Sequence, residues 1–296
     1  HSQQSNPRIL KHQMTTACDS RTPMKVAAIS LNSSPGLVTA NLEAAERLIA
    51  ALDRDTDLAV LPELFSTGFI HDGKQLSLLA ERHGTGTMAD IMRWSRTYDM
   101  AIAGSFLAVE EGKILNRGFI VTPDGNATIY DKHHLFCLSP ESKTFTAGTE
   151  LPPTVHYRGW NIALVICYDL RFPVWCRNKG LRYDMLLVPA NWPHARAYAW
   201  RQLLIARAIE NQAVVVGANR NGQDDYGEYS GLSYIIDPYG GILAPNHKDS
   251  ASHEACCSRE NADVNEIIYS TYALEQIKKL RRRLPVASDA DAFEFT

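Results

Sequence analysis

Short apolar runs of strand length recur along this chain, separated by segments with helical periodicity. The strand candidates, several of them almost continuously apolar, are KVAAISLN, DLAVLPE, MAIAGSF, GFIVTP, NIALVIC, DMLLVPAN, AVVVGAN and LSYIIDP. Such continuous apolar character is typical of strands that are buried on both faces. Between them, NLEAAERLIAALDR, MADIMRWSRTYD and YAWRQLLIARAIENQ place apolar residues at helical spacing. The pattern predicts layered α/β structure in which helices cover the sheets.

Turn motifs and the C-terminal region refine this prediction. TPDGN and DPYGG lie between strand candidates and indicate hairpins. The sheets are therefore expected to be mixed rather than purely parallel. Near the C-terminus, EIIYSTY predicts one more strand, and ALEQIKKLRRRL predicts a helix that ends before Pro285.

The length and composition indicate one large globular unit. The chain has 296 residues, of which 45% are hydrophobic, so it can bury a sizeable core. Residues 24–296 are expected to form a single domain. Residues 1–23 contain no apolar stretch of signal-peptide length and are expected to be an N-terminal extension, either a flexible segment, a tag remnant or a transit segment.

Charge and cysteine usage exclude several classes of partner. A formal net charge of -3 provides no basic field for phosphates, so neither nucleic acid nor an anionic membrane is an expected partner. No uncharged run of about 20 apolar residues suggests a membrane span. The six cysteines form no CxxC pair, which favours a reducing, cytoplasmic setting. A small molecule is the expected ligand.

Cys167 ends the apolar run NIALVIC and begins the motif CYDLRFP. A free cysteine in this position is most simply a packing residue, because free cysteines are among the most buried side chains. However, Pro173 predicts the first turn of a helix through VWCRNKG, so the chain is expected to turn from strand to helix close to the sulfur. A helix N-terminus and the charge of Arg171 would both favour a thiolate. Cys167 is therefore a candidate nucleophile, whereas Cys176 lacks this context and is interpreted as packing.

Glu63 and Lys132 also follow strand candidates. Glu63 ends DLAVLPE, and its apolar flanks mean that its carboxylate is either paired or has a pKa raised toward the range of a general base. The alternative is an exposed acid on a loop. Lys132 follows ATIYD, and taken alone it is most simply a surface lysine.

Together, these residues define a more specific pattern. LPELF at 61–65, YDKHHLF at 130–136 and ICYDLRFP at 166–173 occur in the order Glu, Lys, Cys, each after a strand candidate. In this order and spacing they resemble the nitrilase superfamily of carbon–nitrogen hydrolases, and the resemblance extends from Met24 to Phe293. Within that superfamily, CYDLRFPVWCRN, PANWPHAR and ARAIENQ are similar to the ω-amidase branch.

The resemblance implies a fold and a set of catalytic roles. The implied fold is α/β, a four-layer αββα sandwich with mixed sheets, in which the catalytic residues gather where strands of both sheets end. By motif, Glu63 is the general base, Lys132 the oxyanion stabiliser and Cys167 the nucleophile. Glu141 in LSPESK matches the family's supporting second glutamate. No cofactor and no metal are implied.

The resemblance also implies a substrate class. A short 2-oxo dicarboxylate monoamide, such as 2-oxoglutaramate or 2-oxosuccinamate, is expected to be hydrolysed to carboxylate and ammonia through a cysteine thioester. Arg171 is the candidate partner of its far carboxylate, because a guanidinium can bind a carboxylate by two parallel hydrogen bonds. Arg171 could instead form a structural pair with Asp169 or Glu210.

Other residues are candidates for lining the same pocket. Trp192 and Tyr168 are expected near the substrate, and Arg196 is an alternative carboxylate partner. The backbone N–H of Tyr168 could be a second oxyanion donor, since it follows the nucleophile. Homodimers formed through VWCRNKG and YAWRQLLIARAIENQ are a further implication of the resemblance. The long loop at 248–262, with Cys256 and Cys257, departs from the family pattern.

Alternative functions remain open at this stage. Another amidase of the superfamily or an N-carbamoyl hydrolase would use the same three catalytic residue types. A non-catalytic metabolite-binding protein is expected to lack at least one of the three, and all are present. His133, His134 and His194 offer a cysteine–histidine pair instead, but a histidine base would make the Glu and Lys motifs redundant. His133 and His134 are therefore interpreted as structural or pocket-lining, and no further ligand cluster completes a metal site with them.

Overall fold

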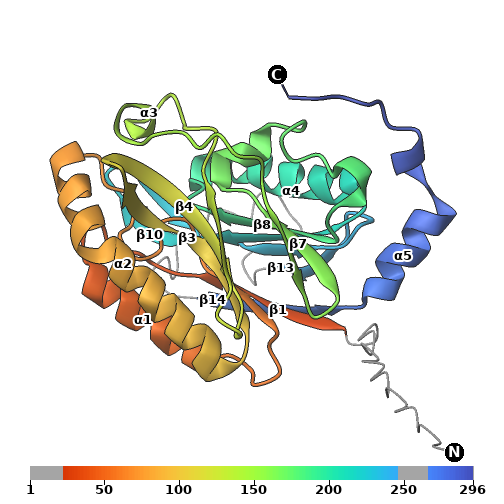
Figure 1. Ribbon diagram of the computed structural model, residues 1–296, viewed down its shortest axis with the longest axis horizontal. Coiled ribbons are helices and arrows are strands. Elements are labelled where there is room, and N and C mark those ends of the chain that lie inside the picture. Colours follow the sequence, from red (N-terminus) through yellow and green to blue (C-terminus); the bar gives the residue numbers. More distant parts are fainter. Residues whose placement is uncertain (1–22, 246–265, 296) are drawn as a thin grey trace, which may run out of the picture.

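The computed structural model describes residues 23–245 and 266–295 and shows two six-stranded sheets packed face to face (Figure 1). The first sheet has the strand order β14-β1-β2-β3-β4-β5, and the second has the order β13-β12-β9-β8-β7-β6. The loop at 248–262 and almost all of the predicted N-terminal extension lie outside the described residues.

The strand bounds follow the apolar runs of the sequence closely. In the first sheet they are β1 (Met24–Ser30), β2 (Leu58–Val60), β3 (Ala101–Glu110), β4 (Lys113–Val121), β5 (Ala127–Asp131) and β14 (Glu266–Tyr272). In the second they are β6 (Thr154–Tyr157), β7 (Trp160–Leu164), β8 (Met185–Ala190), β9 (Val214–Asn219), β12 (Tyr234–Ile236) and β13 (Ile242–Pro245). A separate two-stranded hairpin consists of β10 (Asn221–Asp224) and β11 (Gly227–Ser230).

Both sheets are mixed, as predicted. The central strands β1, β2 and β3 run parallel in the first sheet, as do β7, β8 and β9 in the second. The outer strands join antiparallel, and the motifs TPDGN and DPYGG form the turns of the hairpins β4–β5 and β12–β13.

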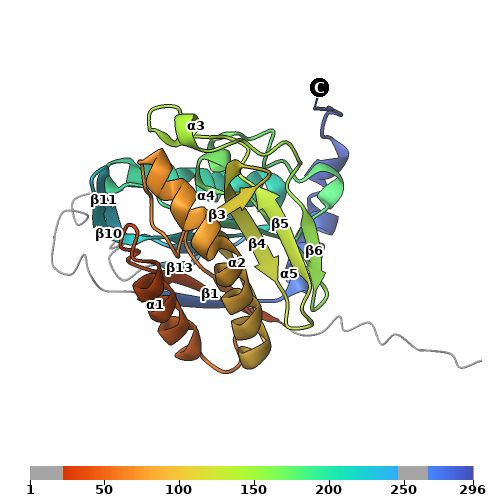
Figure 2. The same ribbon diagram turned by 60° about the vertical axis from the view of Figure 1, so that its left-hand side comes forward.

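Helices cover the outer face of each sheet. Helices α1 (Val38–Ala50) and α2 (Gly73–Tyr98) pack on the first sheet, and α4 (Ala197–Asn211) packs on the second (Figure 2). Side chains alternate along the strands accordingly. Val26 and Ala28 lie in the core between the sheets, whereas Ala27 and Ile29 lie in the core under α1 and α2. The four-layer αββα sandwich is thus confirmed.

One predicted element is wrong. The segment 174–180 is not a helix: Asn178 donates its backbone N–H to the side chain of Asn211, and Gly180 has a left-handed φ of 66°. Both features are incompatible with a continuous helix. A 3₁₀-helix at Cys167–Arg171 forms the turn instead. Patterning also missed the short polar strands β6, β10 and β11 and the helix α3 (Glu141–Thr144).

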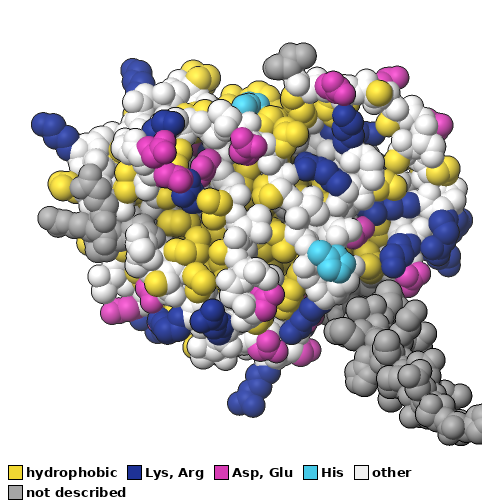
Figure 3. All heavy atoms as spheres, viewed as in Figure 1, with side chains coloured by type: hydrophobic (Ala, Val, Ile, Leu, Met, Phe, Trp, Pro, Cys, Tyr) yellow, Lys and Arg dark blue, Asp and Glu magenta, His cyan; other side chains and the backbone are white. Residues whose placement is uncertain are grey.

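The surface carries charges of both signs. Figure 3 shows acidic and basic side chains spread over one face, with cationic side chains gathered over the helix α5 (Leu274–Arg283). No helix within the described ranges is long and apolar enough to cross a membrane.

Candidate active site

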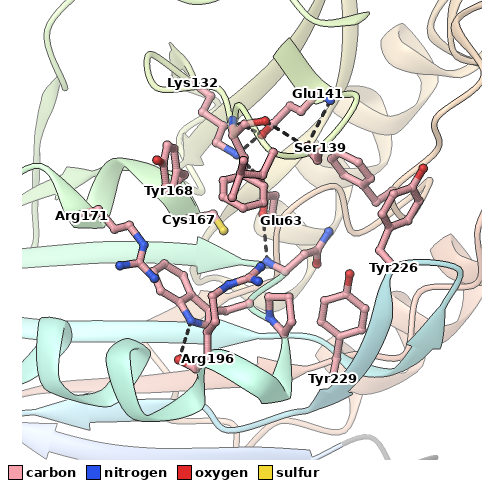
Figure 4. Close-up of a pocket in the computed structure, with 16 residues that line it drawn as sticks. Glu63, Lys132, Ser139, Glu141, Cys167, Tyr168, Arg171, Arg196, Tyr226 and Tyr229 are labelled. Carbon is pink, nitrogen blue, oxygen red and sulfur yellow. Dashed lines mark hydrogen bonds and ion pairs between the residues drawn. The ribbon is translucent and has the colours of Figure 1, made fainter. Parts of the chain in front are cut away.

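Four of the residues singled out by sequence line one cavity (Figure 4). Glu63 follows β2 and Lys132 follows β5 in the first sheet, while Cys167 follows β7 in the second. Glu141 begins α3, in the loop after Lys132. Strands from both sheets therefore deliver these side chains to one cavity.

Glu63 is buried, with 2% of its surface exposed, and both carboxylate oxygens are hydrogen-bonded. Its Oε1 accepts bonds from Asn116 Nδ2 at 2.8 Å and from Lys132 Nζ at 2.8 Å. Its Oε2 accepts a bond from the backbone N–H of Asn191 at 2.9 Å. Because Asn191 follows β8 of the other sheet, this bond fixes Glu63 across the interface between the sheets.

Lys132 lies between two carboxylates. Its Nζ donates to Glu141 Oε1 at 2.6 Å and to Glu63 Oε1 at 2.8 Å, and only 2% of the lysine is exposed. Burial alone would lower its pKa, but Glu141 and Glu63 outweigh that effect, so the pKa of Lys132 is raised and the ammonium stays charged. The interpretation of Lys132 as a surface lysine is therefore wrong.

Glu141 is held at both oxygens as well. Its Oε2 accepts the backbone N–H of Phe136 at 2.7 Å, which ties the loop after Lys132 to the site. Burial raises the pKa of Glu141, and the charge of Glu63 adds to this increase, while Lys132 opposes it. Glu141 thus positions Lys132 and the loop at the same time.

Cys167 sits at a constrained turn. Its φ of 45° lies in the left-handed region, which is uncommon for a residue other than glycine. The buried carboxylate of Asp169 stabilises this turn by accepting the backbone N–H of Ile166 at 3.0 Å and the hydroxyl of Tyr130 at 2.8 Å. The backbone strain is consistent with a functional position, where such strain is concentrated.

The thiol of Cys167 is neutral in the resting site. Burial raises its pKa well above the usual range, and the charge of Glu63 raises it further, with only Lys132 lowering it strongly. The sequence predicted that a helix N-terminus and Arg171 would favour a thiolate, but the helix is absent and burial of the thiol has the opposite effect. A neutral thiol requires a base, and the nearby Glu63 carboxylate is suited to that task.

The four residues line a cavity of about 250 Å³. Its other walls are mainly aromatic and hydroxyl-bearing, with two arginines: Phe69, Phe136, Leu138, Ser139, Tyr168, Arg171, Asn191, Trp192, Pro193, Arg196, Tyr226 and Tyr229. The predicted substrate-binding residues Tyr168, Arg171 and Trp192 all lie on this wall. A thiol, a carboxylate and a buried ammonium on one cavity can add sulfur to a polar carbon and stabilise the resulting oxyanion.

Arg171 forms no ion pair with the residues that the structure describes. Asp169 bonds His134 and Tyr130, and Glu210 pairs with Arg207, so the predicted alternative partners of Arg171 are occupied. Instead, the Arg171 guanidinium lies over the ring of Trp192, 5.0 Å from its centre.

The histidines lie outside the cavity wall. His133 bonds the carbonyl of Gly148 through Nδ1 at 2.7 Å, and its ring stacks on Trp175. His134 Nδ1 lies 2.8 Å from Asp169 Oδ1. His194 is likewise absent from the lining residues. Across residues 23–245 and 266–295, no group of His, Cys, Asp and Glu side chains could hold a metal ion.

Sequence reasoning missed several residues of the site. Asn116 lies within β4, where an isolated polar residue gives no signal of an inward orientation. Tyr226 and Tyr229 come from the polar hairpin β10–β11, which lacks an apolar pattern. Asn191 could have been found, because it ends the apolar run DMLLVPAN in the way that Cys167 ends NIALVIC.

Comparison with known proteins finds relatives that match this chain over most of its length. The sequence model of the carbon–nitrogen hydrolase family matches residues 25–282. Omega-amidase YafV of Yersinia enterocolitica is 39% identical over 255 residues, which cover 86% of this chain and 91% of that protein. The 2-oxoglutaramate amidase of Bacillus subtilis is 33% identical over 247 residues, covering 82% of this chain and 94% of that protein.

Solved structures agree with this result. A CN-hydrolase superfamily protein from Xanthomonas campestris, with an arsenic adduct in its active site, superposes with a TM-score of 0.81 at 31% identity. The match covers 93% of this chain and 100% of that one. Nit3 of Saccharomyces cerevisiae shares the fold, with a TM-score of 0.76 at 24% identity over 90% of this chain and 96% of that one.

Proposed function

The chain belongs to the carbon–nitrogen hydrolase family, and from this premise we propose that it hydrolyses a short ω-amide of a 2-oxo dicarboxylic acid, of the 2-oxoglutaramate or 2-oxosuccinamate type, to carboxylate and ammonia. The observation that carries the proposal is the cavity itself. It joins Cys167, Glu63 and Lys132 to an arginine, Arg171, that has no carboxylate partner in the described chain. The relatives named for ω-amide hydrolysis support the same substrate class.

Acylation starts from the neutral thiol. Glu63 takes the proton of Cys167 as the sulfur attacks the amide carbon, so a thiolate forms only as the carbon–sulfur bond forms. The attack produces a tetrahedral intermediate with a negative oxygen. When this intermediate collapses, the carbon–nitrogen bond breaks, and Glu63 returns the proton to the leaving nitrogen, releasing ammonia. A thioester to Cys167 remains.

Oxyanion stabilisation is assigned to Lys132. Its ammonium is desolvated and fixed by Glu63 and Glu141, so it needs no reorganisation when charge develops on the substrate oxygen. The backbone N–H of Tyr168 is the proposed second donor. It lies in the first turn of the 3₁₀-helix that begins at Cys167, where N–H groups lack partners within the helix.

Deacylation uses the same groups in reverse order. Glu63 removes a proton from water, and the resulting hydroxide attacks the thioester carbon. Lys132 again faces the oxyanion. The carbon–sulfur bond then breaks, the thiol regains its proton and the carboxylic acid product leaves.

Arg171 is the proposed partner of the substrate carboxylate. Stacking on Trp192 holds the guanidinium on the cavity wall without neutralising its charge. A carboxylate at that position fixes the distance from the far end of the substrate to the amide under attack.

Kinetics on two classes of amide test the proposal. The wild-type enzyme should release ammonia from 2-oxosuccinamate far faster than from neutral amides such as butyramide. Arg171→Lys should raise KM for the carboxylate-bearing amide about tenfold or more, with a much smaller effect on butyramide. Equal effects on both amides, or a lowered melting temperature, would assign Arg171 to structure. Faster turnover of neutral amides or of N-carbamoyl amino acids by the wild type would replace the proposed substrate class.

We also propose that the enzyme is a homodimer. The outward face of α4 exposes Ile209 at 49%, and the turn after the nucleophile exposes Val174 at 53%. Burying such apolar side chains against a second copy would stabilise a pair. Light scattering at micromolar concentration should give twice the chain mass of 33.0 kDa, and Ile209→Glu should shift it toward one chain. A wild-type protein that is only monomeric removes this proposal.

We further propose that the enzyme is located in the cytoplasm. Cys137, Cys167 and Cys176 are all free thiols, and a cysteine nucleophile is inactivated by oxidation. Activity should therefore fall in an oxidising buffer.

A further inference from the structure

The cavity contains a second arginine with no ionic partner. Arg171 and Arg196 both line it, and neither forms an ion pair with any residue the structure describes. Figure 4 shows both guanidinium groups on the same side of the cavity, beneath Cys167. Two unpaired cations near a single nucleophile exceed what one substrate carboxylate requires.

Both arginines are held in place by aromatic contacts. The Arg196 guanidinium lies over the ring of Phe136, 5.2 Å from its centre, and Arg171 lies over Trp192 at 5.0 Å. Trp192 also donates its Nε1–H to the backbone carbonyl of Arg196 at 2.9 Å. One indole thus positions the two arginines relative to each other. Aromatic faces orient a guanidinium but leave its N–H donors available to a ligand.

The carboxylates of the cavity wall are already engaged. Glu63 accepts bonds from Lys132, Asn116 and the N–H of Asn191, and Glu141 accepts from Lys132 and the loop backbone. Both acids pair with Lys132, and neither pairs with Arg171 or Arg196 among the described residues. The part of the cavity near the arginines therefore presents a positive charge with no compensating acid.

We propose that Arg196 recognises the substituent at carbon 2 of the substrate, accepting a 2-oxo oxygen and rejecting a 2-ammonium group. This inference rests on the proposed function and adds a specificity-determining residue to it. In a 2-oxo acid, the oxo oxygen is adjacent to the carboxylate, so neighbouring guanidinium groups can bind the two together: Arg171 binds the carboxylate, and Arg196 donates to the oxo oxygen.

The same arrangement disfavours the corresponding amino acid amides. Asparagine differs from 2-oxosuccinamate only in carrying an ammonium group at carbon 2, which would face Arg196 and find no carboxylate. Like charges disfavour this complex, and the Arg196 N–H groups lose their acceptor. Succinamate, with a methylene at carbon 2, loses only the hydrogen bond. These three amides therefore separate the effects of charge and of hydrogen bonding.

The test compares kcat/KM for 2-oxosuccinamate, succinamate and asparagine in the wild type and in Arg196→Gln. Arg47→Gln serves as the matched control, because it removes one exposed positive charge from α1 on the outer layer. Arg196→Gln should lower kcat/KM for 2-oxosuccinamate about tenfold or more and leave succinamate within about twofold. The preference for 2-oxosuccinamate over asparagine should shrink by at least the same factor. Arg47→Gln should leave all three values unchanged.

Each other outcome contradicts the inference. If Arg196→Gln lowers kcat/KM equally for 2-oxosuccinamate and succinamate, Arg196 binds the carboxylate or supports the fold. If kcat/KM is unchanged for all three amides, Arg196 has no role in substrate recognition. Failure of the proposed function is distinguishable, because the wild type would then turn over neither 2-oxosuccinamate nor 2-oxoglutaramate. If the wild type hydrolyses 2-oxosuccinamate but Arg196→Gln keeps the wild-type ratios of kcat/KM among the three amides, the role of Arg196 is refuted and the proposed function stands.

Discussion

At the scale of single residues, the site depends on one ammonium group, that of Lys132, which forms ion pairs with two carboxylates. Lys132 remains an ammonium because Glu63 and Glu141 surround it, and the neutral Cys167 lies next to this cluster. The sequence identified these four residues through their motifs. It could not reveal that burial keeps the thiol protonated, because the local pattern suggested a helix terminus and Arg171 as its neighbours. The predicted helix does not form, and desolvation of the buried thiol raises its pKa.

Glu141 provides a residue-scale prediction. Glu141→Gln keeps an oxygen for the N–H of Phe136 but weakens the hold on Lys132, so the ammonium is less well positioned for the oxyanion. We expect kcat to fall about 10- to 100-fold while KM changes much less, since the loss affects the transition state. Steady-state ammonia release measures both constants. The matched control Glu150→Gln, on an exposed loop, should leave kcat and KM unchanged. A kcat for Glu141→Gln within about twofold of the wild-type value would contradict the role assigned to Glu141.

At the scale of elements, strand ends carry the site. β2, β5 and β7 each end just before a residue of the site, and their apolar runs made both the strands and these polar ends predictable. The segment 174–180 shows the limit of such prediction. Asn178 bonds the nearby backbone of Tyr183 and the side chain of Asn211, which is 33 residues further along the chain, and these bonds replace helical ones. The polar hairpin β10–β11 was missed because it has no apolar pattern.

The close approach of β4 to β7 provides a prediction at this scale. A Cβ at Gly118 would lie 2.5 Å from Leu164 Cδ2 and 3.1 Å from Ile166 Cδ1, on the strand that leads to Cys167. Gly118→Ala should therefore lower the free energy of unfolding by about 1–3 kcal/mol and reduce kcat. The same substitution at Gly86, an exposed position of α2 with open space around it, should raise stability by up to about 1 kcal/mol. Urea unfolding measures both, and a Gly118→Ala protein as stable as wild type would contradict this packing.

At the scale of the whole molecule, the site exists only when the two sheets dock. Glu63 from the first sheet bonds the N–H of Asn191 from the second, and Ser30 bonds Ser233 across the same interface at 2.8 Å. Apolar periodicity predicted the layers and the mixed sheets. It could not predict how the sheets face each other, because that arrangement depends on contacts between residues far apart in sequence. The resemblance to a known family supplied that information.

Burial of ionisable groups in this core predicts loss of stability at alkaline pH. Burial raises the pKa of Cys176 from 9.0 to about 12. In the unfolded chain the thiol loses its proton near pH 9, while the folded protein retains it. The stability contributed by this group is therefore complete below pH 9 and is lost as the pH rises toward 12, by about 1.4 kcal/mol per pH unit.

Denaturation at several pH values tests this expectation. Above pH 9, the free energy of unfolding should fall less steeply with rising pH for Cys176→Ala than for the wild type. The two slopes should differ by about 1.4 kcal/mol per pH unit, which is the contribution of one proton. Identical slopes for the two proteins would show that Cys176 titrates normally in the fold.

The central claim is that Cys167 is the nucleophile of an amide-hydrolysing centre, and ammonia release from 2-oxosuccinamate by Cys167→Ala tests it most directly. We predict a rate of about one thousandth of the wild-type value or less, with an unchanged melting temperature, because Cys167 is the only thiol among the described residues that line the cavity. Cys137→Ala, which removes an exposed thiol, should keep nearly full activity in the same assay. A folded Cys167→Ala protein that retains more than about a tenth of the wild-type rate would contradict the account.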